Sequence, residues 1–203
     1  MDIKYSVTFA RRGLLYQESL QLAKLYVELQ DWSKVRQQAL ASNLLQTRTI
    51  STSKKLCSEV TSRLRTLTEE QFHLLTTAAI DEQRYLLWLA VCKCYKLLFD
   101  FAQEVLHEKY LRLDLHLSYN DYDQFFNLKA DWHEELSRHS METHKRVRQT
   151  VFQLMREAQL INNHNEILPV LVSAKFVRII CNDSKNNLSI FPLSDQDVRA
   201  FAR

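Results

Sequence analysis

The chain has 203 residues, 46% of them hydrophobic and 25% charged, and it contains one glycine and two prolines. This is the balance of a globular protein, and the scarcity of glycine and proline removes the usual residues of tight turns and sheet corners, so we expect mostly helices. The single glycine also excludes phosphate-binding loops, dinucleotide-binding fingerprints and G-x-S-x-G nucleophile elbows, because each of these motifs needs several glycines.

The formal net charge is only +3, but the charges are segregated along the chain. Residues 36–65 contain six basic residues and one acid, Glu59, and residues 138–156 contain five basic residues and one acid, Glu142. The stretch between them, 66–137, contains six basic and thirteen acidic residues. The two basic stretches are therefore the candidates for contact with an anionic partner.

Hydrophobic periodicity and capping residues divide the chain into helices. In the N-terminal region, residues 1–80, we predict helices at about 14–29, 32–42, 51–66 and 68–77, the second capped by Asp31 and the fourth opened by the capping box Thr68–Gln71. In the remaining region, residues 81–203, we predict helices at about 81–112, 118–130, 132–138 and 141–160, and a short last helix capped by Ser194. The two regions are expected to pack as one globular unit.

The predicted helix 81–112 is apolar nearly all round from Tyr85 to Phe101, which is the pattern of a helix surrounded by others. Lys93 and Lys96 interrupt this run, so we expect no membrane span. The predicted fold is therefore all-α: a compact multi-helix protein around a long central helix, with two helix-turn-helix-like motifs.

Near the C-terminus the pattern is mixed. Residues 168–181 fit either a helix or a strand, and residues 188–193 fit a strand. We therefore expect at most a minor β wing, within residues 167–193. It would carry Lys175, Arg178 and Lys185.

The predicted helix 51–66 has two unlike faces. Leu56, Val60 and Leu64 share its apolar side, whereas the opposite side is basic, rich in hydroxyls and free of acids. Glu59 and Arg63 lie on the flank, four residues apart, where they can pair with each other. Such side chains suit phosphates and base edges, and the helix before it completes a helix-turn-helix arrangement. The DNA-binding residues predicted here are Arg48, Thr49, Ser51, Lys54, Lys55, Ser58, Ser62 and Arg65.

The predicted helix 141–160 repeats this pattern, with Val147, Val151 and Leu154 on its apolar side. The helices before it give a second helix-turn-helix-like motif, which the wing would extend. The DNA-binding residues predicted here are Lys145, Arg146, Arg148, Gln149 and Arg156. Both basic faces are also compatible with an ordinary solvated surface.

No pattern of catalytic or metal-binding residues is present in the sequence. Cys92 and Cys94 are two apart on a helix and point about 200° apart, so they cannot grip one metal ion, and we expect core thiols without disulfides. The seven histidines lack metalloprotease spacing. We expect no catalytic residue, metal or cofactor, and we interpret Trp32, Trp88 and Trp132 as core anchors.

Several short motifs, taken in order, resemble the BrxA family of small core proteins from BREX bacteriophage-exclusion systems. They are Gly13–Ser19, Asp31–Trp32, Asn43–Thr49 leading into Ser53, Arg63–Leu67, Glu82–Gln83 followed by Cys92–Lys93, and Glu108–Arg112. The resemblance covers nearly the whole chain, from about residue 5 to residue 193. It implies a helical fold with helix-turn-helix elements, binding of double-stranded DNA, and a role beside a site-specific DNA methyltransferase and other BREX proteins.

We therefore predict a cytoplasmic, monomeric, non-catalytic protein whose partners are double-stranded DNA, bound mainly through phosphates, and other BREX proteins. Two alternatives remain open. The first is an adaptor whose acidic stretch, residues 66–137, engages another defence protein. The second is a helical RNA-binding protein, which competition between duplex DNA and structured RNA would distinguish.

Overall fold

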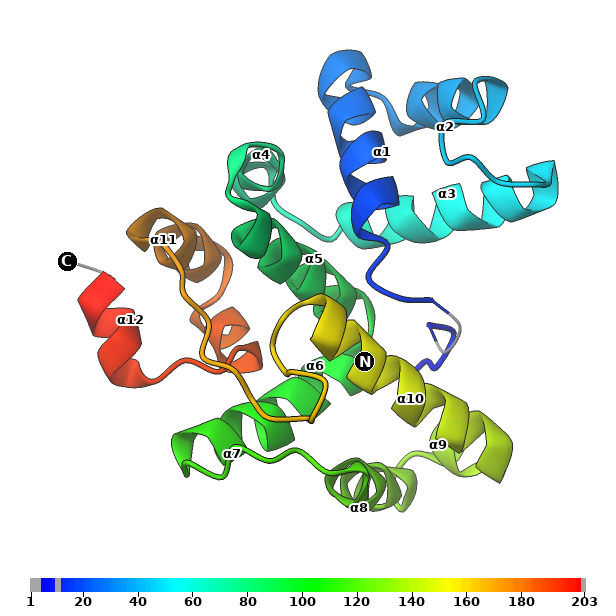
Figure 1. The fold of residues 1–203 in the computed structure, drawn as a ribbon. Coiled ribbons are helices and arrows are strands. Elements are labelled where there is room, and N and C mark those ends of the chain that lie inside the picture. The colour runs from blue at the N-terminus through cyan, green and yellow to red at the C-terminus, as the bar shows by residue number, and fades with distance from the viewer. Residues whose placement is uncertain (1–4, 10–11, 202–203) are drawn as a thin grey trace.

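A computed structural model describes residues 5–9 and 12–201 (Figure 1). Within these ranges the regular structure consists of α-helices, one π-helical segment and one 3-10 helix, and no strand is present. Two isolated β-bridges, His116 with Glu166 and Ile161 with Ile167, are the β pairings of this part of the chain. The predicted all-α class is confirmed.

The first four helices begin close to the predicted residues, and local side-chain caps open the second, third and fourth of them. They are α1 (Tyr16–Leu29), α2 (Trp32–Ala41), α3 (Ile50–Leu64) and α4 (Glu69–Thr77). Asp31 accepts a hydrogen bond of 2.7 Å from the Ser33 amide, and both bonds of the Thr68–Gln71 capping box form. Helices α1, α2 and α3 contact one another and form a three-helix group on one side of the molecule (Figure 1).

The prediction of one continuous helix over residues 81–112 is wrong in one respect, because the helix is interrupted at Tyr95. The segments are α5 (Ile80–Cys94), α6 (Lys96–Phe101), the π-helical η1 (Ala102–His107) and α7 (Glu108–Leu111). Tyr95 is extended, with φ −129° and ψ 99°, and its hydroxyl donates a 2.6 Å hydrogen bond to Glu59 of α3. A tertiary contact thus accompanies the break, which helical periodicity does not encode.

Helix α5 is the central element that the sequence predicts. Tyr85 to Cys92 are all buried, and α5 contacts helices from both the N-terminal and the C-terminal part of the chain. Trp88 is fully buried, and its indole Nε1 donates a 3.1 Å hydrogen bond to the Ile190 carbonyl. In the described part of the chain, no helix combines the length and hydrophobicity that crossing a bilayer requires.

The remaining helices lie around this centre. They are α8 (Tyr119–Ala130), α9 (Glu134–Ser137), α10 (Met141–Glu157), α11 (Ala174–Asp183), the 3-10 helix η2 (Lys185–Ile190) and α12 (Asp195–Phe201). Ser118, Ser140 and Ser194 provide caps, as their positions in the sequence predict.

The expected β wing does not form within residues 167–193. Instead, Ser173 caps α11, and the helical spacing of Phe176, Val177 and Ile180 buries one side of this helix. The stretch 168–173 before it is irregular. The helical alternative for this stretch holds from Ala174 onward, because a buried apolar stripe at helical spacing needs no sheet.

The predictions for the cysteines and for two of the tryptophans have different outcomes. The four cysteines are free, as expected. Trp32 is half-buried and stacks on Tyr26, with ring centroids 4.1 Å apart. The prediction that Trp132 is a core anchor is wrong, because its side chain is 87% exposed. Trp132 follows the last turn of α8, where the apolar stripe of that helix no longer determines which side chains are covered.

Candidate nucleic-acid interface

Helix α3 presents the two faces that its sequence predicts. Leu56, Cys57, Val60 and Leu64 are buried against α1, α2 and α5. The predicted DNA-binding side chains are all exposed, namely Arg48, Thr49, Ser51, Lys54, Lys55, Ser58, Ser62 and Arg65. Thr49 also caps the helix, accepting a 3.2 Å hydrogen bond from the Thr52 amide. The exposure of these residues is thus as the sequence predicts, and their function remains a prediction.

A buried arginine fixes the orientation of α3. Arg63 is 2% exposed, and its Nε donates to Glu59 Oε1 at 2.9 Å while Nη1 donates to the Gly13 carbonyl at 2.8 Å. Glu59 accepts in addition from the Tyr95 hydroxyl. The predicted Glu59–Arg63 pair is therefore present, and it joins α3 to Tyr95 at the end of α5 and to the N-terminal segment.

The cations on the exposed face of α3 have no acidic partner in the described part of the chain. None of Arg48, Lys54, Lys55 and Arg65 forms an ion pair with another described residue. The charges are therefore available to an external anion, subject to screening by salt.

The second predicted set, on α10, is placed differently. Lys145 and Gln149 are exposed. Arg146 pairs with Glu142 at 2.8 Å, and Arg148 pairs with Asp123 of α8 and lies 4.8 Å from the centre of the Tyr119 ring. Arg156 donates a 2.7 Å hydrogen bond to the Asn165 side chain. Three of these four cations thus already have polar partners within the chain, so α3 is the stronger candidate surface.

The partners of Arg148 form a cluster between α8 and α10. Asp123 Oδ1 lies 3.3 Å from Nε2 of His144, and the His144 ring lies 4.2 Å from that of Phe126. Burial lowers the pKa of His144, Asp123 opposes this shift, and Arg148 adds to it. Asp123 therefore serves the contact between α8 and α10 and balances the positive charge of this face.

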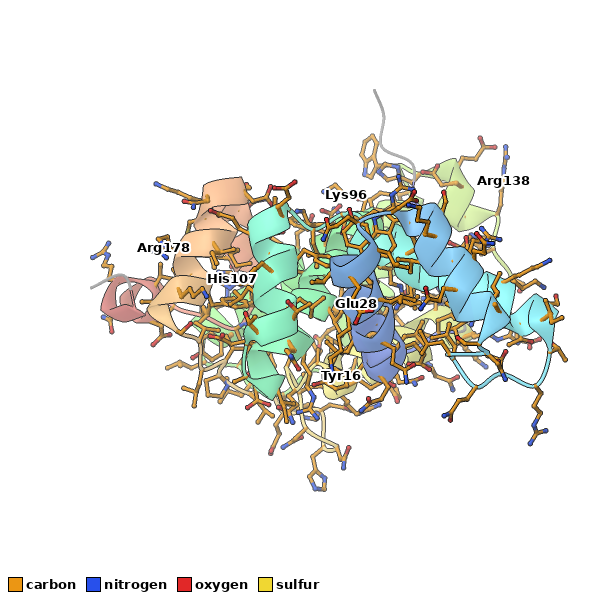
Figure 2. All side chains as sticks on the ribbon, turned by 90° about the horizontal axis from the view of Figure 1, so that it is seen from above. Tyr16, Glu28, Lys96, His107, Arg138 and Arg178 are labelled. Atoms are coloured by element: carbon orange, nitrogen blue, oxygen red, sulfur yellow. The ribbon has the colours of Figure 1, made fainter. Side chains whose placement is uncertain are left out.

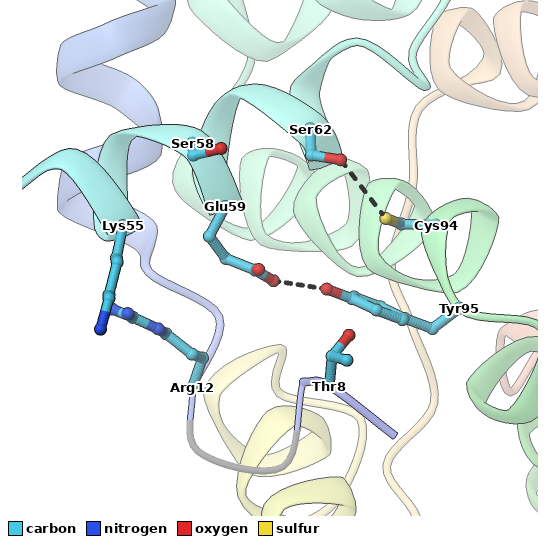
Figure 3. A pocket seen from close by; sticks show the side chains of 8 residues that line it. All are labelled: Thr8, Arg12, Lys55, Ser58, Glu59, Ser62, Cys94 and Tyr95. Atoms are coloured by element: carbon cyan, nitrogen blue, oxygen red, sulfur yellow. Dashed lines mark hydrogen bonds between the residues drawn. The ribbon is translucent and has the colours of Figure 1, made fainter. Parts of the chain in front are cut away.

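Two hollows flank the exposed face of α3. One is lined by Thr8, Arg12, Lys55, Ser58, Glu59, Ser62, Cys94 and Tyr95, and Figure 3 shows it from close by. The other is lined by Trp32, Ser33, Arg36, Ser58, Thr61, Ser62 and Arg65. Ser58 and Ser62 line both hollows, so the hydroxyls of α3 lie between two basic depressions.

The family of the chain follows from its sequence matches. Residues 3–184 match the family model described as BrxA. The chain belongs to the BrxA family. It is 24% identical over 159 residues to "BREX protein BrxA" of Bacillus cereus (strain H3081.97), which covers 78% of this chain and 80% of that relative. It is 23% identical over 149 residues to "BREX protein BrxA" of Escherichia coli O9:H4 (strain HS), covering 73% and 70%.

The BrxA-family fold is also seen in a solved structure, described as the crystal structure of an uncharacterized protein from Magnetospirillum magneticum. The two superpose with a TM-score of 0.77 at 18% identity, over 94% of this chain and 100% of that one. At this identity the likeness concerns the fold alone, and it extends over nearly all of the chain.

No metal centre is recognisable in the described part of this BrxA-family chain, where no three His, Cys, Asp or Glu side chains are grouped to hold an ion. Burial raises the pKa of Cys57, Cys92 and Cys94. The thiolate is the reactive form of cysteine, so these three side chains lack the activation that a nucleophile requires.

Two basic residues of the hollows are missing from the residues predicted from sequence. Arg36 lies in the basic stretch 36–65 and on the helix before α3, and this position in the predicted helix-turn-helix arrangement was a usable signal. Arg12 lies outside every predicted helix and has no such signal. Only the packing of the N-terminal segment beside α3 brings it to the interface.

Proposed function

We propose that this protein is a non-catalytic component of a BREX phage-defence system that binds double-stranded DNA, mainly through phosphates, with the exposed face of α3. The observation that carries the proposal is the set of exposed hydroxyls and cations on this face, the cations having no ion-pair partner among the residues that the structure describes. The names of the two relatives support the placement in a BREX system. Their names state nothing about DNA.

The dimensions and chemistry of α3 suit a duplex. A helix of 15 residues is about 22 Å long, and a B-DNA duplex carries one phosphate charge for about every 1.7 Å of its axis. Arg48 precedes the helix and Arg65 follows it, with Lys54 and Lys55 between them. Lysine and arginine neutralise phosphates and release counterions, and serine hydroxyls donate to phosphate oxygens.

The direct test is a fluorescence anisotropy titration with an arbitrary DNA duplex at two salt concentrations, with structured RNA and single-stranded DNA as competitors. We expect salt-sensitive binding that prefers duplex DNA. The variant Lys54→Glu with Arg65→Glu should weaken this binding and reduce its salt dependence, because it removes two phosphate contacts.

A matched control changes the same charges elsewhere. Lys175 and Arg178 are exposed on α11, on the opposite side of the molecule from α3 (Figures 1 and 2). The control Lys175→Glu with Arg178→Glu should bind closer to the wild type than the α3 variant does. If both variants weaken binding equally, net charge explains the effect and the assignment to α3 is wrong. A preference for structured RNA would favour the RNA-binding alternative.

A second function, as an adaptor for another defence protein, is favoured by one exposed apolar pair. The side chains of Trp132 and Leu128, at the end of α8, are 87% and 66% exposed. Tryptophan is enriched among the residues that dominate binding energy in protein interfaces. If this pair contacts a BREX partner, Trp132→Ala should reduce co-purification with the other BREX proteins without affecting duplex binding.

A further inference from the structure

The hollow between α3 and the N-terminal segment is lined by two cations from different parts of the chain, Arg12 and Lys55. In the view of Figure 3 their side chains extend toward the same side of the hollow. Neither side chain forms an ion pair with any other described residue. Two like charges that line one hollow repel each other, and an anion bound between them offsets this repulsion.

The acid that lines the hollow does not neutralise these two cations. Glu59 Oε1 accepts hydrogen bonds from Arg63 Nε at 2.9 Å and from the Tyr95 hydroxyl at 2.6 Å. Figure 3 shows its carboxylate directed toward Tyr95 and away from Arg12 and Lys55. Its charge is therefore balanced by buried Arg63, and the mouth of the hollow stays positive.

Hydrogen bonds hold the backbone at and after Arg12. Its amide donates a 2.9 Å hydrogen bond to the carbonyl of fully buried Phe9. The next carbonyl, of Gly13, accepts from Arg63 of α3, and the amide of Leu14 donates to the Glu157 carboxylate of α10. Gly13 and Leu14 are thus bonded to two helices, and Arg12 directly precedes them in the segment beside α3.

We propose that Arg12 and Lys55 together form a seat for a single backbone phosphate of bound duplex DNA. The seat deepens the proposed function and rests on it. The planar guanidinium of Arg12 offers a fork of donors for two phosphate oxygens, Lys55 adds a point charge, and the hydroxyl of Ser58 on the wall offers a further donor. DNA would then be held by α3 and the N-terminal segment together.

The test compares Arg12→Gln, Lys55→Gln and the double variant in duplex titrations over a range of salt concentrations. Each phosphate contact contributes about 0.9 to the slope of log affinity against log salt. If the two cations share one phosphate, the magnitude of this slope should fall by about 0.9 in the double variant, and it should fall by no more than that in either single variant. We expect the double variant to lose about tenfold in affinity, as for a charge-assisted hydrogen bond.

The matched controls are Arg178→Gln, Lys175→Gln and their double variant on α11, which remove the same charges from the opposite side of the molecule. A slope loss of about 1.8 in the Arg12 and Lys55 double variant would show two separate phosphates and overturn the shared seat. A double variant that behaves like its control would also overturn it.

Failure of the seat is distinguishable from failure of the proposed function. If Lys54→Glu with Arg65→Glu weakens duplex binding while the Arg12 and Lys55 double variant does not, α3 binds DNA without this seat. Thermal unfolding with inorganic phosphate separates the two sources of a phosphate group. If phosphate stabilises the wild type but not the double variant, and the duplex slopes are equal, the site takes a small phosphorylated ligand and the assignment to DNA is wrong.

Discussion

Replacing Gly13 with alanine tests how the N-terminal segment is joined to α10. A Cβ atom at this position would lie 2.5 Å and 2.6 Å from the two carboxylate oxygens of Glu157. These atoms are the end of a flexible side chain, so the carboxylate can swing aside. In doing so it gives up the hydrogen bond that it accepts from the Leu14 amide.

The expected magnitude follows from this exchange. Losing a hydrogen bond to a charged acceptor costs about 2 kcal/mol. Alanine also lowers the conformational entropy of the unfolded chain, which stabilises the folded state by about 0.7 kcal/mol where alanine can adopt the native backbone conformation. We therefore expect Gly13→Ala to lower the free energy of unfolding by about 1 kcal/mol, measured from the midpoint and slope of a urea titration.

A double-mutant cycle with Glu157→Ala isolates the cause. Glu157→Ala removes the three atoms that lie nearest to the new Cβ, so Gly13→Ala should be neutral or slightly stabilising in that background. An equal loss of stability in both backgrounds would refute the reasoning, because it would show that the backbone, and not Glu157, excludes a side chain at residue 13.

Three further predictions concern other parts of the structure. Arg63→Met should lower the free energy of unfolding by about 3 kcal/mol in a urea titration, because it leaves Glu59 without its cation. The double variant Arg63→Met with Glu59→Leu should recover most of this loss, because it removes the unpaired charge as well. Burial lowers the pKa of His144, so the unfolded chain binds a proton at a pH where the folded chain does not. The stability that His144 contributes above pH 6.5 should therefore decrease as the pH falls below that value, and the urea midpoint of His144→Gln should change less between pH 7.5 and pH 5.5 than that of the wild type. Trp132→Ala should change the free energy of unfolding by no more than about 0.5 kcal/mol, since the side chain is 87% exposed; a larger loss would show that it packs against the fold.

The pairing of the basic residues separates what a linear pattern reveals from what packing decides. The periodicity of α3 correctly predicts which side chains are exposed, because its neighbours cover one continuous apolar stripe. The same reasoning on α10 predicts a similar basic face, yet Arg148 pairs with Asp123 and Arg156 bonds to Asn165. Periodicity gives the direction of a side chain and not the charge of what it meets.

By itself, the sequence determined the helical class, most helix starts and the outward face of α3. Caps such as Asp31 and Ser118 act on amides two or three residues away, so their effect is visible in the sequence. Only the tertiary structure decided the break at Tyr95, the exposure of Trp132 and the position of Arg12. These depend on contacts between distant residues, such as the bond between Leu14 and Glu157 across 143 positions, and no local pattern specifies such contacts.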